Sequence, residues 1–279
     1  MSRPVRIEFA GALYHVSSKG RGGQIVFNDA VDKGAFLNIL DSVVSRFDWL
    51  IHSYVLMSDH YHLVVEISDP NLSKGMRQLN GVYTQHVNRR HAQEGAIFQG
   101  RFKSILLEKK NYLLSVCRHV VTNPNRAESS SSFNSFKWSS YRALSGQVET
   151  PEFLYTEDIL DHFGGPKKTA QKRYREYIKE GLEEVSPLIQ RSNQVLLGSD
   201  RFLKEMQPFL RGESLVKKGP KAVKRRRSLS ALFKRVNEKP RSERNRLMKK
   251  AHVDFGYTLV DIGDHLGLHY TTVSKVINT

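Results

Sequence analysis

The stretch from Met57 to Glu66 constrains the fold of this chain more than any other part of it. Apolar and polar residues alternate there with a period of two, which is the pattern of a strand. Because successive side chains of a strand point to opposite faces, His60, His62 and Glu66 share one face. Two imidazoles so placed can hold a divalent cation together. An isolated His-x-His motif is equally compatible with two solvent-facing histidines on a half-exposed sheet.

The surrounding pattern predicts an α+β domain. Strands are predicted for residues 12–18, 50–56, 57–66 and 102–107, and helices for residues 29–46, 72–90 and 111–122. Asn28 is expected to cap the first helix and Pro124 to stop the third. The order β-α-β-β-α-β is that of the ferredoxin-like fold, with helices on one side of an antiparallel sheet. Nucleic-acid-binding domains often use the open face of such a sheet as a platform, but a fold alone does not give function.

Four parts are predicted along the chain. They are a first domain at 1–148, a helical accessory region at 152–210, a basic linker at 211–250 and a C-terminal helix-turn-helix module at 251–279. In the accessory region a stripe of residues at helical spacing is expected to be core, namely Ala170, Tyr174, Tyr177, Ile178 and Leu182. In the last module Gly263 and Gly267 stand where a helix-turn-helix needs a small residue and a turn with positive φ.

The second helix of that C-terminal module would lie in the major groove of duplex DNA. Tyr270, Thr271, Ser274 and Lys275 would then face the DNA, while the apolar residues between them pack inward. A plain helical hairpin without a DNA role is the alternative. The neighbouring basic segment favours DNA binding.

Charge and composition indicate a polyanionic partner. The chain carries a net charge of +16, and residues 211–250 contribute 16 Lys or Arg against three acidic residues. Such an excess suits nucleic acid or an acidic membrane surface. The single cysteine, Cys117, excludes an intramolecular disulfide and suits a reducing compartment. With no visible signal peptide and no apolar run of about 20 residues, we expect a cytoplasmic protein without a membrane partner.

Six blocks occur in a fixed order. They are Leu-Met-Ser-Asp-His-Tyr-His-Leu at 56–63, Asn-Gly-Val-Tyr-Thr at 80–84, Val-Asn-Arg-Arg-His at 87–91, Phe-Gln-Gly-Arg-Phe-Lys-Ser at 98–104, the stretch 118–124 and Trp-Ser-Ser-Tyr-Arg at 138–142. Over residues 5 to 145 this succession resembles the REP-associated tyrosine transposases of the HUH single-strand transposase superfamily. The resemblance implies metal-dependent cleavage and transfer of hairpin-bearing single-stranded DNA, with Mg or Mn as cofactor and a tyrosine that forms a 5′-phosphotyrosine link. It also implies His60, His62 and Asn123 as metal ligands.

The sequence departs from this family at the nucleophile, because His119 occupies the position of the tyrosine. His119 lies one helical turn before Asn123 and would share a helix face with it. Tyr112 stands about 10 Å away along the helix axis and Tyr83 lies on another helix, so both are poor substitutes. His119 would act as a further nitrogen ligand or as a general base for water. Alternatively, cleavage has been lost and the protein is a DNA-binding or regulatory protein.

Basic residues near the predicted site are candidates for phosphate contacts. They are Lys19, Arg21, Arg89, Arg90, Arg101 and Lys103. Each could equally be a solvated surface charge. An RNA-binding module is a weaker alternative, because the aromatic pair that stacks bases in such modules is not evident. The sequence favours neither a monomer nor a homodimer.

Overall fold

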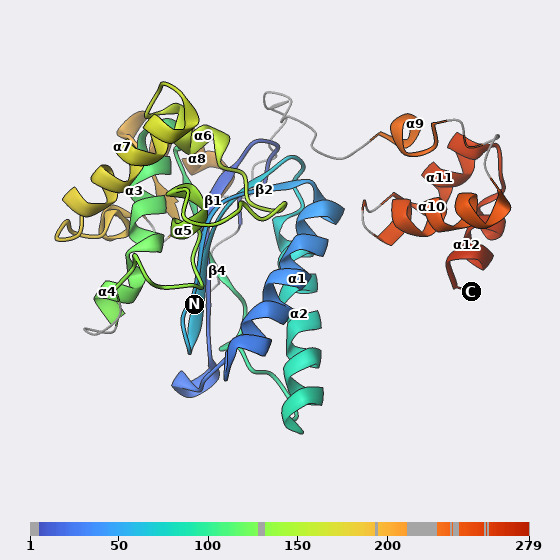
Figure 1. The fold of residues 1–279 in the computed structure, drawn as a ribbon, viewed down its shortest axis with the longest axis horizontal. Coiled ribbons are helices and arrows are strands. Elements are labelled where there is room, and N and C mark those ends of the chain that lie inside the picture. The colour runs from blue at the N-terminus through green and yellow to red at the C-terminus, as the bar shows by residue number, and fades with distance from the viewer. Residues whose placement is uncertain are drawn as a thin grey trace.

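A five-stranded sheet forms the centre of the first domain (Figure 1). The computed structural model describes residues 6–127, 132–192, 195–210, 228–234, 236, 240–253, 255 and 257–278. The strands are β1 (Leu13–Lys19), β2 (Trp49–Leu56), β3 (His60–Ile67), β4 (Lys103–Leu107) and β5 (Leu196–Leu197). Their spatial order is β2-β3-β1-β4-β5, and β1 to β4 pair antiparallel. The predicted α+β, ferredoxin-like fold is therefore confirmed.

Two long helices cover one face of the sheet, as predicted. They are α1 (Ala30–Phe47) and α2 (Leu72–His91), and a single 3-10 turn, η1 (Arg21–Gly23), precedes them. Tyr61, Leu63 and Val65 of β3 lie in the core beneath these helices and are fully buried. The side chains of His60 and His62 therefore lie on the opposite face of the sheet, as the alternation of residues along β3 predicts.

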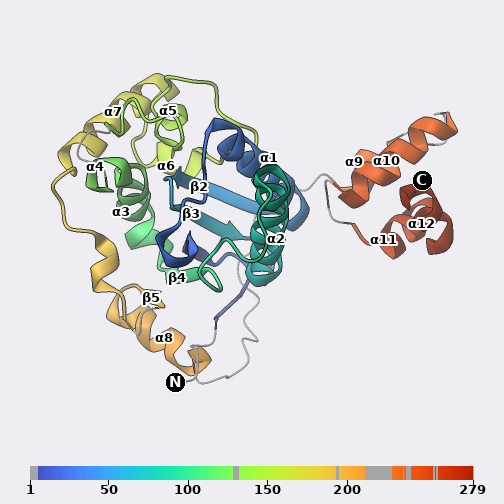
Figure 2. The same cartoon turned by 90° about the horizontal axis from the view of Figure 1, so that it is seen from below.

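The opposite face of the sheet is covered as well, so the prediction that helices pack on one side of the sheet only is wrong. The helices on this second face are α3 (Lys109–Val121), α5 (Tyr141–Leu144), α6 (Glu157–Asp161) and α7 (Lys167–Glu180) (Figure 2). The physical reason is that this face is also apolar, because Val55, Val64 and Ile105 belong to a second buried core. A sheet that is apolar on both sides must be covered on both sides.

The ends of two helices differ from the prediction. Asp29, not Asn28, caps α1, because its carboxylate accepts hydrogen bonds from the backbone N–H groups of Val31 and Asp32. Pro124 does not simply stop the third helix. α3 ends at Val121 and a short helix, α4 (Asn123–Ala127), follows, in whose first turn proline is tolerated. Across the described residues, no helix combines the length and the apolar character that crossing a membrane requires.

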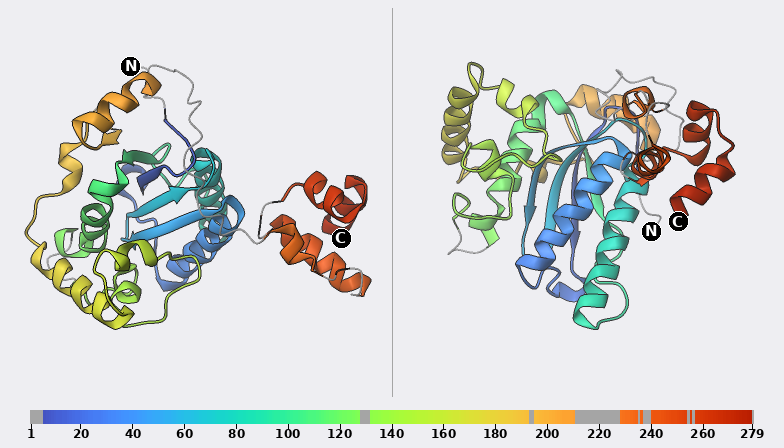
Figure 3. Two further views of the ribbon diagram at one scale, coloured as in Figure 1. Left: turned by 90° about the horizontal axis from the view of Figure 1, so that it is seen from above. Right: turned by 45° about the vertical axis from the view of Figure 1, so that its right-hand side comes forward.

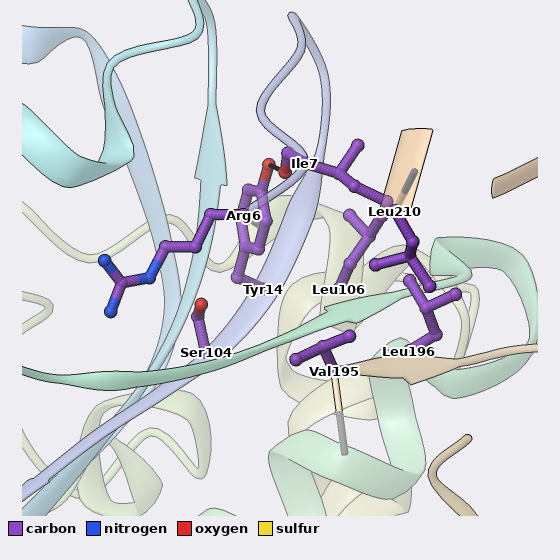
Figure 4. A pocket seen from close by; sticks show the side chains of 8 residues that line it. All are labelled: Arg6, Ile7, Tyr14, Ser104, Leu106, Val195, Leu196 and Leu210. Carbon is purple, nitrogen blue, oxygen red and sulfur yellow. Dashed lines mark hydrogen bonds between the residues drawn. The ribbon is translucent and has the colours of Figure 1, made fainter. Parts of the chain in front are cut away.

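The accessory region is helical, but it also adds a strand to the sheet. After α7 come a 3-10 helix, η2 (Pro187–Gln190), then β5 and then α8 (Asp200–Leu210). β5 pairs in parallel with the end of β4, and Figure 4 shows this seam, where Leu106, Leu196 and Leu210 lie close together. Of the predicted stripe, Ala170, Tyr174 and Ile178 are buried in the second core, whereas Tyr177 and Leu182 are partly buried and pack against it.

The C-terminal helices share a core of their own (Figure 3). They are α9 (Leu229–Leu232), α10 (Arg241–Val253), α11 (Leu259–Leu266) and α12 (Tyr270–Asn278). α9 and most of α10 fall within the segment predicted as a basic linker, whose residues 211–227 lie outside the described part of the chain. Gly267 has a φ of 65°, and a Cβ on Gly263 would lie 2.5 Å from the carbonyl oxygen of Leu268. The turn between α11 and α12 thus needs both glycines.

Gly75 provides a test of the packing between α2 and the sheet. A Cβ at this position would lie 2.1 Å from the ring of the fully buried Trp49. We expect Gly75→Ala to lower the free energy of unfolding by about 1–3 kcal/mol through overpacking. Urea titrations followed by tryptophan fluorescence report on this domain, because the two tryptophans, Trp49 and Trp138, both lie in it.

Gly81 on the same helix is the matched control. A Cβ there meets open space, so Gly81→Ala is expected to raise stability by about 0.5–1 kcal/mol through helix propensity alone. Equal stabilities of the two variants would contradict the packing described here.

Candidate functional site

His60 and His62 lie at the start of β3, with ring centroids 5.1 Å apart and nearly perpendicular planes. Nδ1 of His60 is 2.5 Å from a carboxylate oxygen of Asp59. Burial alone would raise the pKa of Asp59, but hydrogen bonding and the charges of His60 and Lys19 lower it overall. The ionised carboxylate accepts the Nδ1–H of His60, and this leaves the Nε2 lone pair available as a ligand.

His15 of β1 is the partner of His62, and the sequence analysis missed it. Its Nε2 is 2.9 Å from Nδ1 of His62, and the two rings stack with centroids 5.0 Å apart. Burial, followed by the charges of His119 and Arg191, lowers the pKa of His15 to about 3. Burial and the neighbouring histidines also hold the pKa of His62 well below its ordinary value. Both rings are therefore neutral, and one donates to the other. When His62 donates from Nδ1, its Nε2 carries the lone pair.

His119 and Asn123 complete the arrangement from the second face of the sheet. The side-chain oxygen of Asn123 is 3.3 Å from Nε2 of His60. The ring centroid of His119 lies 6.3 Å from that of His62 and 6.4 Å from that of His15. Asn123 does not share a helix with His119, because α3 ends at Val121 and Asn123 begins α4. The structure nevertheless brings His60, His62, His119 and Asn123 together, and with His15 they are called here the histidine cluster.

The donors of the histidine cluster suit a divalent cation. On both His60 and His62 the Nδ1 atom is occupied by a neighbour, so the Nε2 atoms are the ones left to ligate. Asn123 adds an amide oxygen beside His60. A site with two imidazole nitrogens and one oxygen fits Mn at least as well as Mg.

A second group of possible metal ligands lies near the other end of β3, but the ammonium group of a lysine occupies the space between them. His52, Glu66 and Asp158 bring ligand atoms within 4.8 Å of one another. The ammonium group of Lys109, however, is 2.7 Å from the Glu66 carboxylate and 2.6 Å from that of Asp158. The positive charge that these carboxylates require is thus supplied by the chain itself, and this group is a structural ion-pair network.

Neither tyrosine that the sequence offers as a substitute nucleophile is placed for that role. Tyr83 is fully buried, and its hydroxyl donates to the carbonyl of Val26 at 2.9 Å. Tyr112 is half-buried and donates to the side chain of Gln190 at 3.4 Å. Tyr112 and His119 both line a cavity of about 220 Å³ between α3 and η2, whereas His15 and His62 line a different cavity.

The predicted phosphate-binding residues fall into three groups. Arg90 is held by two carboxylates, at 2.5 Å from Asp29 and 2.6 Å from Asp32, which favours a structural role. Lys19 lies 3.5 Å from Asp59, beside His60. The remaining ones, namely Arg21, Arg89, Arg101 and Lys103, are exposed. Arg101 and Lys103 line the cavity that reaches His15 and His62.

In the C-terminal module, α12 presents the side chains that the sequence predicts. Tyr270, Thr271 and Lys275 are exposed and Ser274 is half-buried, while Val273 is fully buried against the other helices. A contact of any of them with DNA stays a prediction.

The first domain matches a known protein family. Residues 12–144 match the family model described as "Transposase IS200 like". No curated protein matches the chain. A solved structure of a REP-associated tyrosine transposase bound to a REP hairpin is similar with a TM-score of 0.47 and 14% identity, over 56% of this chain and 92% of that chain. The domain formed by residues 12–144 therefore belongs to the IS200-like transposase family.

Proposed function

We propose that this protein binds hairpin-bearing single-stranded DNA at the histidine cluster and holds a phosphate there, without forming a covalent tyrosine link to the DNA. The observation that carries the proposal is the state of His60 and His62. Their Nδ1 atoms are engaged by Asp59 and His15, so a ligand pair is preorganised in a transposase domain. The position expected of the nucleophile holds His119 instead.

The cation belongs to this proposal as a cofactor. His60, His62 and Asn123 would hold Mg or Mn, which when bound polarises the phosphate that a nucleophile attacks. Asp59 and His15 would keep the two ligand rings in the orientation and tautomer that ligation needs. Because His15 and His62 are neutral, they do not repel the cation, and a proton does not occupy the nitrogen that would bind it.

The absence of a phenol at position 119 supports a cleavage-deficient binding protein. Among the described tyrosines, Tyr83 is buried in the core, and Tyr112 precedes position 119 on α3 by seven residues, which is about 10 Å along the helix axis. Nucleophilic attack needs the reacting atoms within about 3.5 Å of each other. The net charge of +16 supports binding to a polyanion.

The C-terminal module would add a second DNA contact, to duplex DNA. The turn at Gly267 and the close approach at Gly263 support a helix-turn-helix formed by α11 and α12. The exposed face of α12 then carries Tyr270, Thr271 and Lys275 toward the major groove.

Substitution at position 119 tests the proposal for the first domain. We expect wild-type protein, incubated with labelled hairpin DNA and Mn, to shift the DNA in a native gel without forming an adduct that survives denaturant. His119→Tyr should gain such an adduct, because it supplies a phenol beside the retained ligands. His119→Phe, which has a ring of similar size and no hydroxyl, is the control and should form none.

Other results of this experiment would contradict the proposal. A denaturant-resistant adduct with wild-type protein would require another nucleophile. Free nicked product without an adduct would indicate hydrolysis, with His119 as a base for water. DNA that neither shifts nor reacts would remove the assignment to single-stranded DNA.

The depressed pKa of His15 predicts a pH dependence of stability. Its ordinary value is 6.5 and its folded value is about 3, so the unfolded chain takes up a proton over this range that the folded chain excludes. Stability is therefore full above about pH 6.5 and falls as the pH drops toward 3, by up to about 1.4 kcal/mol per pH unit from this group. We expect urea titrations to show a steeper loss for wild-type protein than for His15→Gln. Parallel slopes would show that His15 is not buried in neutral form.

Duplex binding by the C-terminal module is tested at Lys275. We expect Lys275→Ala to weaken binding to duplex DNA and to reduce the slope of log affinity against log salt by about 0.9, the effect of one lost phosphate contact. Lys249→Ala, on an exposed position of α10, should leave both unchanged. Fluorescence anisotropy over a range of salt concentrations measures the two quantities. Equal slopes for both variants would favour a helical hairpin without a DNA role.

A further inference from the structure

A cavity of about 560 Å³ opens beside the histidine cluster, and chain segments outside the transposase-family match complete it. His15 and His62 line one side, and Arg101 and Lys103 line another. Arg6 and Arg191 also line it, yet both lie outside residues 12–144. The family domain alone therefore does not make this cavity.

The wall that carries Arg191 is fixed to the sheet. The backbone N–H of Leu106 donates to the carbonyl of Val195 at 2.8 Å, and that of Glu108 donates to the carbonyl of Leu197 at 2.9 Å. Figure 4 shows Val195 beside Ser104 at this edge, with the side chain of Arg6 directed away from the cluster of leucines. Arg191 itself donates to the carbonyl of Leu188 at 2.7 Å. Residues 187–192 and 195–197 thus form a wall of the cavity that is held in place by hydrogen bonds.

The charge of this cavity suits an anion. None of its described lining residues is acidic. Within the described part of the chain, Arg101, Lys103 and Arg191 have no carboxylate within 4.0 Å. Arg90, by contrast, has two. Uncompensated cations that face a common space attract a phosphate group.

The size and the apolar lining of the cavity suit a nucleobase as well. Its volume falls within the range of small-ligand sites, so it can admit a single nucleotide but not a base-paired duplex. Phe102, Ile105 and Leu188 supply apolar surface among the cations. The apolar surface suits the base of a nucleotide and the cations suit its phosphate. The cavity also reaches His62, beside the proposed phosphate position.

We propose that this cavity binds one unpaired nucleotide of the DNA strand, next to the phosphate held at the histidine cluster, and that Arg191 contacts the phosphate of that nucleotide. The source of the nucleotide, a DNA strand, rests on the proposed function. The accessory region would then be part of the DNA-binding surface and not only a cover for the second face of the sheet.

The test compares two DNA hairpins that have the same stem and loop. One ends in a blunt stem, and the other carries about four unpaired nucleotides on both its 5′ and 3′ strands. We expect the unpaired nucleotides to raise the affinity of wild-type protein about tenfold, as base stacking and phosphate contacts do for single strands. Arg191→Ala should lose most of that gain, with little change in binding to the blunt hairpin. It should also reduce the salt slope for the tailed hairpin by about 0.7.

Two further variants separate the effect of Arg191 from general effects of charge. Arg191→Lys keeps the cation and should retain most of the salt slope. Lys172→Ala removes an exposed cation of α7 and should behave as wild type on both hairpins. Equal affinity of wild-type protein for both hairpins would overturn the proposal, as would a full gain retained by Arg191→Ala.

A free nucleotide distinguishes failure of this inference from failure of the proposed function. If wild-type protein binds neither hairpin, the proposed function fails. Titration with 2′-deoxyadenosine 5′-monophosphate, followed by NMR or calorimetry, then tests the cavity alone. Binding that weakens in Arg191→Ala and not in Lys172→Ala would support a nucleotide site, and absence of binding would overturn it.

Discussion

The antiparallel pairing of β1 with β3 is the constraint on which the site depends. In this register Ser17 lies opposite His62 and Lys19 lies opposite His60. His15 is two residues before Ser17 on the same face of β1, and it therefore reaches His62 diagonally. A shift of one residue in the register would turn His15 to the other face of the sheet. The hydrogen bond between His15 and His62 is thus fixed by backbone pairing before any ligand binds.

The second face of the sheet ties the accessory region to the helix that carries His119. Arg118, next in the chain, is buried, lies 4.2 Å from the ring centroid of Tyr177 and forms an ion pair with Glu184. A Cβ on Gly181 would lie 2.2 Å from its guanidinium carbon, so a small residue is needed there. The position of α3 over the histidine cluster therefore depends on α7 and on the segment that follows it.

A structural feature of this protein could be predicted from the sequence where it depends on residues close together in the chain. The face shared by His60 and His62 follows from strand alternation, and the turn at Gly267 follows from glycine, so both were predictable. His15 required the register between two strands, which the pattern within one strand does not contain. The prediction of helices on one side only was wrong because Val55 and Val64 make the second face of the sheet apolar as well. β5 has only two residues, too few to show a periodic pattern in the sequence. The proposed contact of Arg191 with a nucleotide depends on the pairing of β5 with β4, which brings this segment to the cavity.

The two proposed histidine ligands and position 119 lie on different elements of this fold. His60 and His62 are set by β3, with Asp59 and His15 behind them, whereas position 119 is set by α3. The hydrogen bonds that join His15 to His62 and Asp59 to His60 do not involve position 119. The segment around η2 strengthens this division, because Leu188 lines the cavity that contains His62 while Gln190 lines the one that contains His119. The proposed binding of a phosphate and a nucleotide therefore depends on the strands and on the segment around η2, whereas the chemistry at position 119 depends on α3.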